Sequence, residues 1–347
     1  MTGMSVATRR KSAVRKLVRY GAAVALMAVG ACARNENPSN AVVPEPEPAV
    51  TSYAIGPNQT SVGSATVYVT RQGDTLLDIA RQYDLGYTQL ITANRGIDPW
   101  KPGIERQIVI PGYYLVPNVP RRGIVINLAQ QRLYYFPPGG NTVETFPIGV
   151  GVEGWVTPLG ATKIVEKEDH PTWHPPPSIR AEDADLPSVV PPGPDNPLGD
   201  YAFRLTWPAY LIHGTNKPYG IGRNVSHGCV HLYPEDMAHL FQEIPVGTPV
   251  RVIDREVEAA WIGPDLYVAV FPNKEQTEAL DTDAPVPPIL PKELKQQVKE
   301  AAGSRAGFVD WAAVETAARE RTGIPVRVTR LTEDVTNKSL PLADSRP

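Results

Sequence analysis

The chain has 347 residues, of which 42% are hydrophobic and 20% charged, and a formal net charge of −3 at pH 7. Residues 1–31 hold six of the 34 Lys and Arg and none of the 37 Asp and Glu, so the remainder carries a charge of −9. This sign argues against nucleic acid as a partner, and the length suffices for two domains or more.

The first 31 residues predict an export signal. Six basic residues precede the apolar run Tyr20–Gly30, which is about 11 residues long against the ~20 that span a bilayer. Small residues then precede Cys32, and this pattern resembles a bacterial lipobox. The resemblance implies that Cys32 is lipidated and becomes the N-terminus of a periplasmic lipoprotein. Because Ala33 follows, the outer membrane is the expected anchor site; an ordinary signal peptide with a chance cysteine is the alternative.

The segment 32–65 is predicted to be a disordered tether. It consists mostly of Asn, Pro, Ser, Glu, Ala and Val, and Pro44–Pro48 alternates proline with glutamate, which favours extended polyproline geometry. Such a tether would let a membrane-anchored protein work well away from the bilayer.

Residues 66–112 predict a small module in the order strand, helix, helix, strand. A short strand at 67–69 leads through Gly73-Asp74-Thr75-Leu76 and two helical stretches to the strand Gln107–Pro111. This order and these motifs resemble a LysM module. The resemblance implies binding to the N-acetylglucosamine backbone of peptidoglycan, and one copy should bind weakly and raise the local substrate concentration. A small αβ domain of unrelated purpose is the alternative.

Residues 121–254 predict a mainly β domain with a single helix that begins at Pro234. Residues 169–199 have almost no regular pattern, which is typical of a lid or a binding loop. The remainder, 255–347, predicts a β-hairpin around Gly263-Pro264-Asp265 and, after a Pro-rich stretch, helices at 291–302 and 308–321. The sequence assigns this extension no chemistry.

Cys229 carries the chemistry that the sequence predicts. If Cys32 holds lipid, Cys229 has no second cysteine with which to form a disulfide, which favours a chemical role over a structural one. It ends the stretch Ser226-His227-Gly228-Cys229, sixteen residues after His213. An imidazole can take the thiol proton, and backbone N–H groups can hold the oxyanion that forms. His213, at a strand end, is the expected base, and the amides of His227, Gly228 and Cys229 are the expected oxyanion hole.

The stretches around these residues resemble the L,D-transpeptidase, or YkuD, family: Ile212–Asn216, Gly220–Gly222 and Ser226–Asp236. The resemblance covers about 121–254 and implies a β-sandwich with a short helix, within a multidomain chain. It implies no cofactor and no metal. Cys229 would attack the bond between diaminopimelate and D-alanine in a peptidoglycan tetrapeptide stem, release D-alanine and leave a thioester. His213 would be the base, its ring oriented by the carbonyl of Gly214.

In this family the acceptor is an amine of a second diaminopimelate, which gives a cross-link, or a lysine of an outer-membrane protein. Family members usually have Arg two positions after the cysteine, whereas this chain has His231. A neutral imidazole cannot form a bidentate pair with a stem carboxylate, so either His231 is protonated or Arg180 or Arg223 supplies the charge. The candidate substrate-binding residues are Trp173, Arg180, Asn216, Arg223 and His231.

Three alternatives remain open at this point. His213, His227, Cys229 and His231 could form a zinc site, although they lack the usual paired-ligand spacing. The protein could be a hydrolase of the same fold that uses water as the acceptor. It could also be a non-catalytic lipoprotein that binds the wall through LysM, an alternative that the intact His213 and Cys229 disfavour. The other histidines are expected at the surface or in a structural role: His170, His174 and His239.

Overall fold

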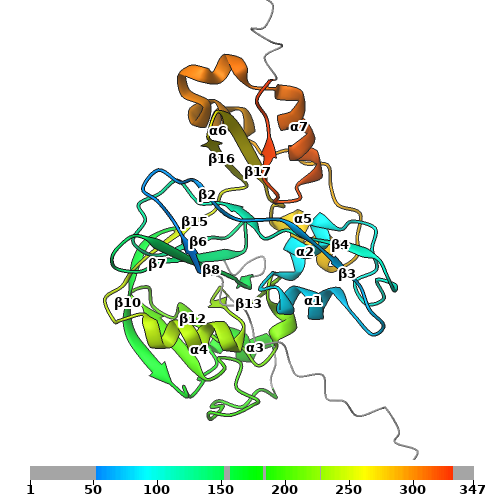
Figure 1. Ribbon diagram of the computed structural model, residues 1–347. Helices are drawn as coiled ribbons and strands as arrows, with labels where there is room; N and C mark the ends of the chain where they lie inside the picture. The colour runs from blue at the N-terminus through cyan, green and yellow to red at the C-terminus, as the bar shows by residue number, and fades with distance from the viewer. Residues whose placement is uncertain (1–51, 152–156, 183–184, 227, 331–347) are drawn as a thin grey trace, which may run out of the picture. The chain divides into compact units, whose positions relative to one another are not determined.

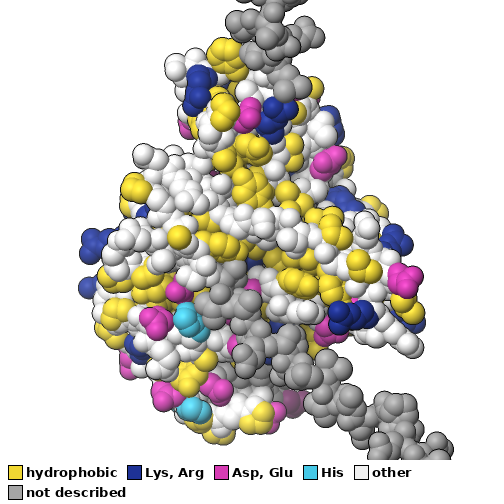
Figure 2. Space-filling view, viewed as in Figure 1, with side chains coloured by type: hydrophobic (Ala, Val, Ile, Leu, Met, Phe, Trp, Pro, Cys, Tyr) yellow, Lys and Arg dark blue, Asp and Glu magenta, His cyan; other side chains and the backbone are white. Residues whose placement is uncertain are grey.

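The computed structural model describes residues 52–151, 157–182, 185–226 and 228–330 (Figure 1). The predicted export signal, Cys32 and His227 therefore lie outside the described residues. On the face drawn in Figure 2, Lys and Arg side chains are scattered among acidic and hydrophobic ones. Within the described ranges, no helix combines the length and hydrophobicity that crossing a membrane requires.

Residues 66–110 form the βααβ module that the sequence predicts. Thr75 caps the first helix by accepting a hydrogen bond from the amide of Asp78 at 3.1 Å. Apolar residues from both helices and the last strand form one core, which includes Leu76, Leu90 and Ile108. The two strands pair antiparallel, and the elements are β3 (Thr66–Val69), α1 (Leu76–Gln82), α2 (Tyr87–Ala93) and β4 (Gln107–Ile110).

The central region of the chain is built on a nine-stranded mixed sheet in the order β1-β8-β7-β6-β15-β10-β11-β12-β14. Strand β10 passes from β15 to β11 through a register shift between Ile164 and Glu166. Side chains from both halves of the sheet belong to one hydrophobic core, to which helix α4 (Pro234–Glu243) adds Met237 and Leu240. The strands are β1 (Ser52–Ala54), β6 (Gly123–Asn127), β7 (Arg132–Phe136), β8 (Thr142–Pro147), β10 (Gly160–Asp169), β11 (Tyr201–Leu205), β12 (Leu211–His213), β14 (Val230–His231) and β15 (Pro249–Ile253).

The tether prediction is wrong for residues 52–65, which belong to the folded part of the chain. Strand β1 pairs antiparallel with β8, and β2 (Ser61–Gly63) pairs with β5 (Tyr113–Leu115). Ile55 and Val62 are buried against the central sheet. Two three-residue strands contain too few residues to produce a visible alternation, so pairing with strands far along the chain decides their structure.

The C-terminal extension forms a compact unit with its own hydrophobic core. The hairpin and two helices lie where the sequence places them, whereas α5 and β18 were not predicted. Helix α5 begins with a capping box in which Asn273 and Gln276 satisfy each other's backbone N–H groups. The elements are β16 (Val257–Ile262), β17 (Asp265–Val270), α5 (Lys274–Asp281), α6 (Leu294–Ala302), α7 (Trp311–Glu320) and β18 (Val326–Arg327).

Arg132 on β7 links the central sheet to the βααβ module, and its side chain has no exposed surface. The guanidinium donates to the carbonyl of Asp84 at 2.7 Å, to Gln89 at 3.2 Å and to Thr145 at 3.1 Å. It also lies over the ring of Tyr114, 4.2 Å from the centroid. A buried cation with these partners ties the module to the sheet, because removing either side strands polar groups away from water.

Arg132→Met should lower the free energy of unfolding by about 3–5 kcal/mol, since it leaves the Asp84 carbonyl and the Gln89 amide without their charged partner. Urea unfolding followed by tryptophan fluorescence measures the loss. Arg251→Met, at an exposed position on β15, is the control and should change stability by less than about 0.5 kcal/mol. Equal unfolding curves for the two variants would contradict the role of Arg132.

Candidate active site

The parallel pairing of β12 with β14 brings the cysteine segment to the histidine segment. The register places Ile212 opposite Val230 and His213 opposite His231. Because side chains alternate along a strand, the two imidazoles lie on one face. Cys229 directly precedes β14, so it lies at the start of the strand that pairs with the one ending in His213.

The Cys229 side chain is half-buried and is present as a thiol. Its Sγ lies 3.7 Å from the carbonyl oxygen of Ala209, and the backbone of Leu211 is a second polar neighbour. Burial raises the pKa of the thiol above its usual value, and the hydrogen bond with Leu211 opposes this only in part. Cys229 therefore rests as the neutral thiol and needs a base before it can attack.

His213 is buried, and one of its ring nitrogens is held by the backbone. Its Nδ1 lies 2.6 Å from the carbonyl oxygen of Gly214, the contact that the family resemblance implies. With the Nδ1 proton donated to that carbonyl, Nε2 is left to accept a proton. Burial lowers the pKa of His213 to about 4, although the carbonyls of Gly214 and Leu198 favour the charged ring. The imidazole is therefore neutral, and available as a base, throughout the neutral pH range.

His231 stands where the family usually has Arg, and it is a neutral group here. Its ring stacks on that of His213, with centroids 6.0 Å apart and planes inclined by 20°. Burial, and next the proximity of His213, lowers the pKa of His231 to about 3. The ring also packs directly on Gly149, where a Cβ atom would come within 2.1 Å of Nε2. His231 thus supplies no positive charge for a stem carboxylate at neutral pH.

The other predicted substrate-binding residues are spread over two segments. Arg223 stacks on Tyr87 of the LysM module, 3.6 Å from the ring centroid, and lies 3.9 Å from the carboxylate of Asp281. Arg180 is exposed on α3 (Pro177–Glu182), a short helix inside the loop that the sequence left irregular. Trp173, in the same loop, pairs with Val190 through two 2.9 Å backbone hydrogen bonds. Asn216 is half-buried just after Thr215.

The structure adds residues that the sequence analysis did not single out. The buried side chain of Asn196 donates to the carbonyl of Pro171 at 2.7 Å and accepts from the amide of Leu198 at 2.9 Å, which ties the two ends of the 169–199 loop together. Thr157 donates to the carbonyl of Gly228 at 2.8 Å, and Gly228 has φ +96°, a conformation open to glycine. The contacts of Asn196 with Pro171 and of Thr157 with Gly228 join segments that lie far apart in the sequence, so no local pattern indicates them.

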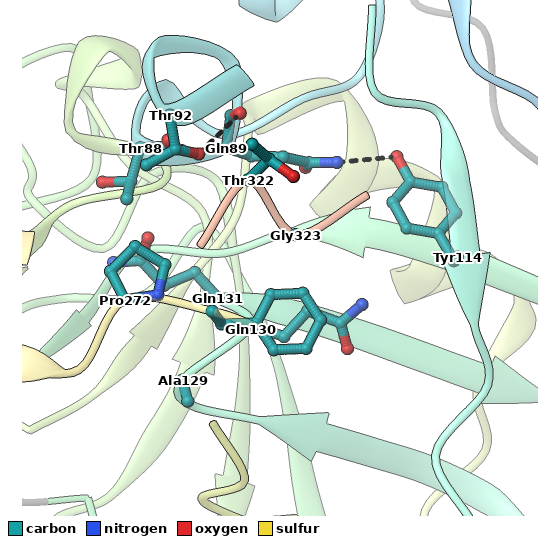
Figure 3. A pocket seen from close by; sticks show the side chains of 11 residues that line it. Thr88, Gln89, Thr92, Tyr114, Ala129, Gln130, Gln131, Pro272, Thr322 and Gly323 are labelled. Carbon is teal, nitrogen blue, oxygen red and sulfur yellow. Dashed lines mark hydrogen bonds between the residues drawn. The ribbon is translucent and has the colours of Figure 1, made fainter. Parts of the chain in front are cut away.

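Among the described residues, which exclude His227, no group of three or more His, Cys, Asp or Glu side chains is placed to hold a metal ion. A small pocket, whose lining does not include Cys229, lies between α2, the turn 129–131 and the segments around Pro272 and Gly323 (Figure 3). Gln89 donates to the hydroxyl of Tyr114 across it at 3.3 Å. This pocket marks the junction of the LysM module, the central sheet and the C-terminal unit.

The acylation rate of Cys229 should be nearly unchanged between pH 7 and pH 5.5. With a pKa of about 4, His213 is only about 3% protonated at pH 5.5, whereas an ordinary histidine would be about 90% protonated. The loss of base therefore begins as the pH falls towards 4. Single-turnover kinetics across this range measure it, and a roughly tenfold fall by pH 5.5 would contradict a buried neutral base.

Comparison with known proteins places these features in a family. Residues 121–252 match the L,D-transpeptidase catalytic domain, YkuD, and residues 68–111 match the LysM domain. Among relatives in Escherichia coli strain K12, the probable L,D-transpeptidase YcfS is 37% identical over 293 residues, 82% of this chain and 88% of the relative. The probable L,D-transpeptidase YbiS is 38% identical over 315 residues, 88% of this chain and 97% of the relative. The probable L,D-transpeptidase ErfK/SrfK is 38% identical over 263 residues, 72% and 80% of the two chains. With a histidine and a cysteine brought to two neighbouring parallel strands, and with relatives that align over most of its length, the chain belongs to the L,D-transpeptidase family.

Proposed function

We propose that this L,D-transpeptidase acts on tetrapeptide stems of peptidoglycan through a thioester on Cys229. The observation that carries the proposal is the β12–β14 register, which brings the Cys229 thiol next to the strand that ends in the neutral His213. A thiol and a neutral imidazole can exchange one proton as the thiol attacks. The LysM module would hold the glycan strand.

Each step of the proposed reaction uses one of these groups. The Nε2 of His213 takes the thiol proton while the Sγ of Cys229 bonds to the carbonyl carbon of diaminopimelate. The amides of Gly228 and Cys229, with that of His227, hold the oxyanion. The carbon–nitrogen bond to D-alanine then breaks, His213 returns the proton to the leaving amine, and the thioester remains.

The thioester is resolved by an amine in the second half of the proposed reaction. The side-chain amine of a second diaminopimelate would give a cross-link, and a lysine of an outer-membrane protein would fasten that protein to the wall. His213 again serves as the base: it takes the proton that the attacking amine loses and returns it to the Sγ of Cys229 as the carbon–sulfur bond breaks. A lipid on Cys32 would anchor the enzyme in the periplasm at the outer membrane, where both acceptors are available.

Cys229→Ser should abolish the thioester adduct that a disaccharide tetrapeptide forms on the enzyme, because it removes the thiol nucleophile, whereas His213→Ala should lower the rate of adduct formation in a folded protein, because it removes the base. Intact-mass spectrometry detects the adduct, and released D-alanine gives the rate. The control is His239→Gln, whose ring contacts Glu144 on β8 at 2.9 Å and which should keep the adduct. No adduct and no D-alanine from the unaltered enzyme with several tetrapeptides would exclude the proposal.

Arg180 is the expected partner of the stem carboxylate, since burial keeps His231 neutral and Arg223 is already held between Tyr87 and Asp281. Arg180→Gln should raise the KM for a carboxylate-bearing tetrapeptide about tenfold, because a charged hydrogen bond is worth about 1.5–3 kcal/mol. The KM for a donor with that carboxylate amidated should stay the same. Equal effects on both donors would assign the charge to another residue.

A further inference from the structure

The connection from His213 to Cys229 is held in large part by the LysM module. It runs from the end of β12 to the start of β14 through a short helical turn, Pro218–Gly220, and the strand β13 (Asn224–Ser226). The amide of Tyr87 donates to the carbonyl of Ile221, and that of Thr88 to the carbonyl of Gly222, both at 3.1 Å. These amides begin α2, which has no side-chain cap, so the connection satisfies them in place of a cap.

Two glycines make this backbone contact possible. A Cβ atom on Gly86 would come within 2.8 Å of the Cα of Gly222, and a Cβ on Gly222 within 2.2 Å of the Tyr87 nitrogen. Gly86 has φ −80° and ψ 152°, which any residue can adopt. Its lack of a side chain is therefore required by the contact with the connection and not by the fold of the module.

Side chains from Tyr87, Arg223 and Asp281, here called the clasp, pack around the connection next to Gly222. Arg223 stacks on Tyr87 and faces Asp281 at the end of α5, and the backbone of Asn224 also hydrogen-bonds to the Asp281 carboxylate. On the other side, Gln131, which lines the pocket of Figure 3, donates to Asn224 at 3.1 Å. Helices α2 and α5 contact each other. Together with the 129–131 turn, they contact the connection at Arg223 and Asn224.

From this clasp a continuous set of contacts leads to the active-site histidines. The amide of Gly222 donates to the carbonyl of Ile148 at 3.1 Å, and the next residue, Gly149, exchanges two backbone hydrogen bonds with His231, of 2.8 and 3.1 Å. The His231 ring hydrogen-bonds to the backbone of Gly220 and stacks on His213. Moving Gly222 would thus displace the groups that flank the reacting pair.

We propose that the LysM module positions the catalytic connection, with Tyr87 as the positioning residue, so that acyl transfer depends on the docked module even when the donor contains no glycan. This inference rests on the proposed function and adds a second role to the module. Its physical basis is that misplacing a catalytic group by about 1 Å can lower the rate about 100-fold.

Acylation by a glycan-free tetrapeptide tests the proposal in the full chain. Gly86→Ser introduces a Cβ at the contact while supplying a good helix cap, and should lower kcat about 10–100-fold with KM changed less than threefold. The matched control is Gly56→Ser, because Gly56 has open space around it and no positive φ. Wild-type rates for Gly86→Ser in a folded protein would overturn the proposal.

If Gly86→Ser does not fold, two variants of Tyr87 test the same proposal. Tyr87→Leu removes the ring under Arg223 and should lower kcat about 10–100-fold. Tyr87→Phe keeps the ring, and its kcat should stay within about threefold of the wild-type value. Melting temperatures measured in parallel separate positioning from unfolding. Unchanged rates for Tyr87→Leu, or equal losses in both variants, would overturn the role of the ring. An unaltered enzyme that forms no adduct would instead refute the proposed function.

Discussion

The parallel contact between β12 and β14 is the constraint on which the active site depends. Two short strands, joined by a connection of about fifteen residues, place His213 and His231 side by side and set Cys229 at the entrance to β14. A parallel pair cannot be closed by a tight turn, so the connection must leave the sheet and return. The path of this connection therefore depends on the elements that pack against it, and these include the LysM module and helix α5.

Burial of the reacting groups gives the site its resting charge state. Both imidazoles lie in a poorly hydrated environment that lowers the pKa of His213 to about 4 and that of His231 to about 3, while burial raises the pKa of the Cys229 thiol. A thiolate–imidazolium pair would be disfavoured in such surroundings, so the proposed attack would start from a neutral thiol and a neutral imidazole, and charge would separate only as the thiol attacks. The same burial explains why His231 is a packing group and not a substitute for arginine.

The LysM module and the catalytic domain are joined by buried and half-buried polar contacts. Arg132 is fully buried between them, and Arg81 forms a bidentate pair with Glu235 on α4, at 2.8 and 3.0 Å. The hydroxyl of Tyr233 adds a hydrogen bond to the carbonyl of Leu85 at 3.1 Å. A module that served only to raise the local concentration of substrate would not need these contacts with the catalytic domain, because a flexible linker between the two would raise it equally well.

The sequence alone determined the family, the βααβ module and the hairpin, and it singled out Cys229 and His213 as the candidate nucleophile and base, because each of these is encoded in short-range spacing and motif. It could also have revealed α5 through the capping pair Asn273 and Gln276. Tertiary structure decided the rest: strands β1 and β2 in the expected tether, the neutral state of His231, and the engagement of Arg223 with the LysM module. These features arise from burial and from contacts between residues far apart in the chain, and no local pattern records them.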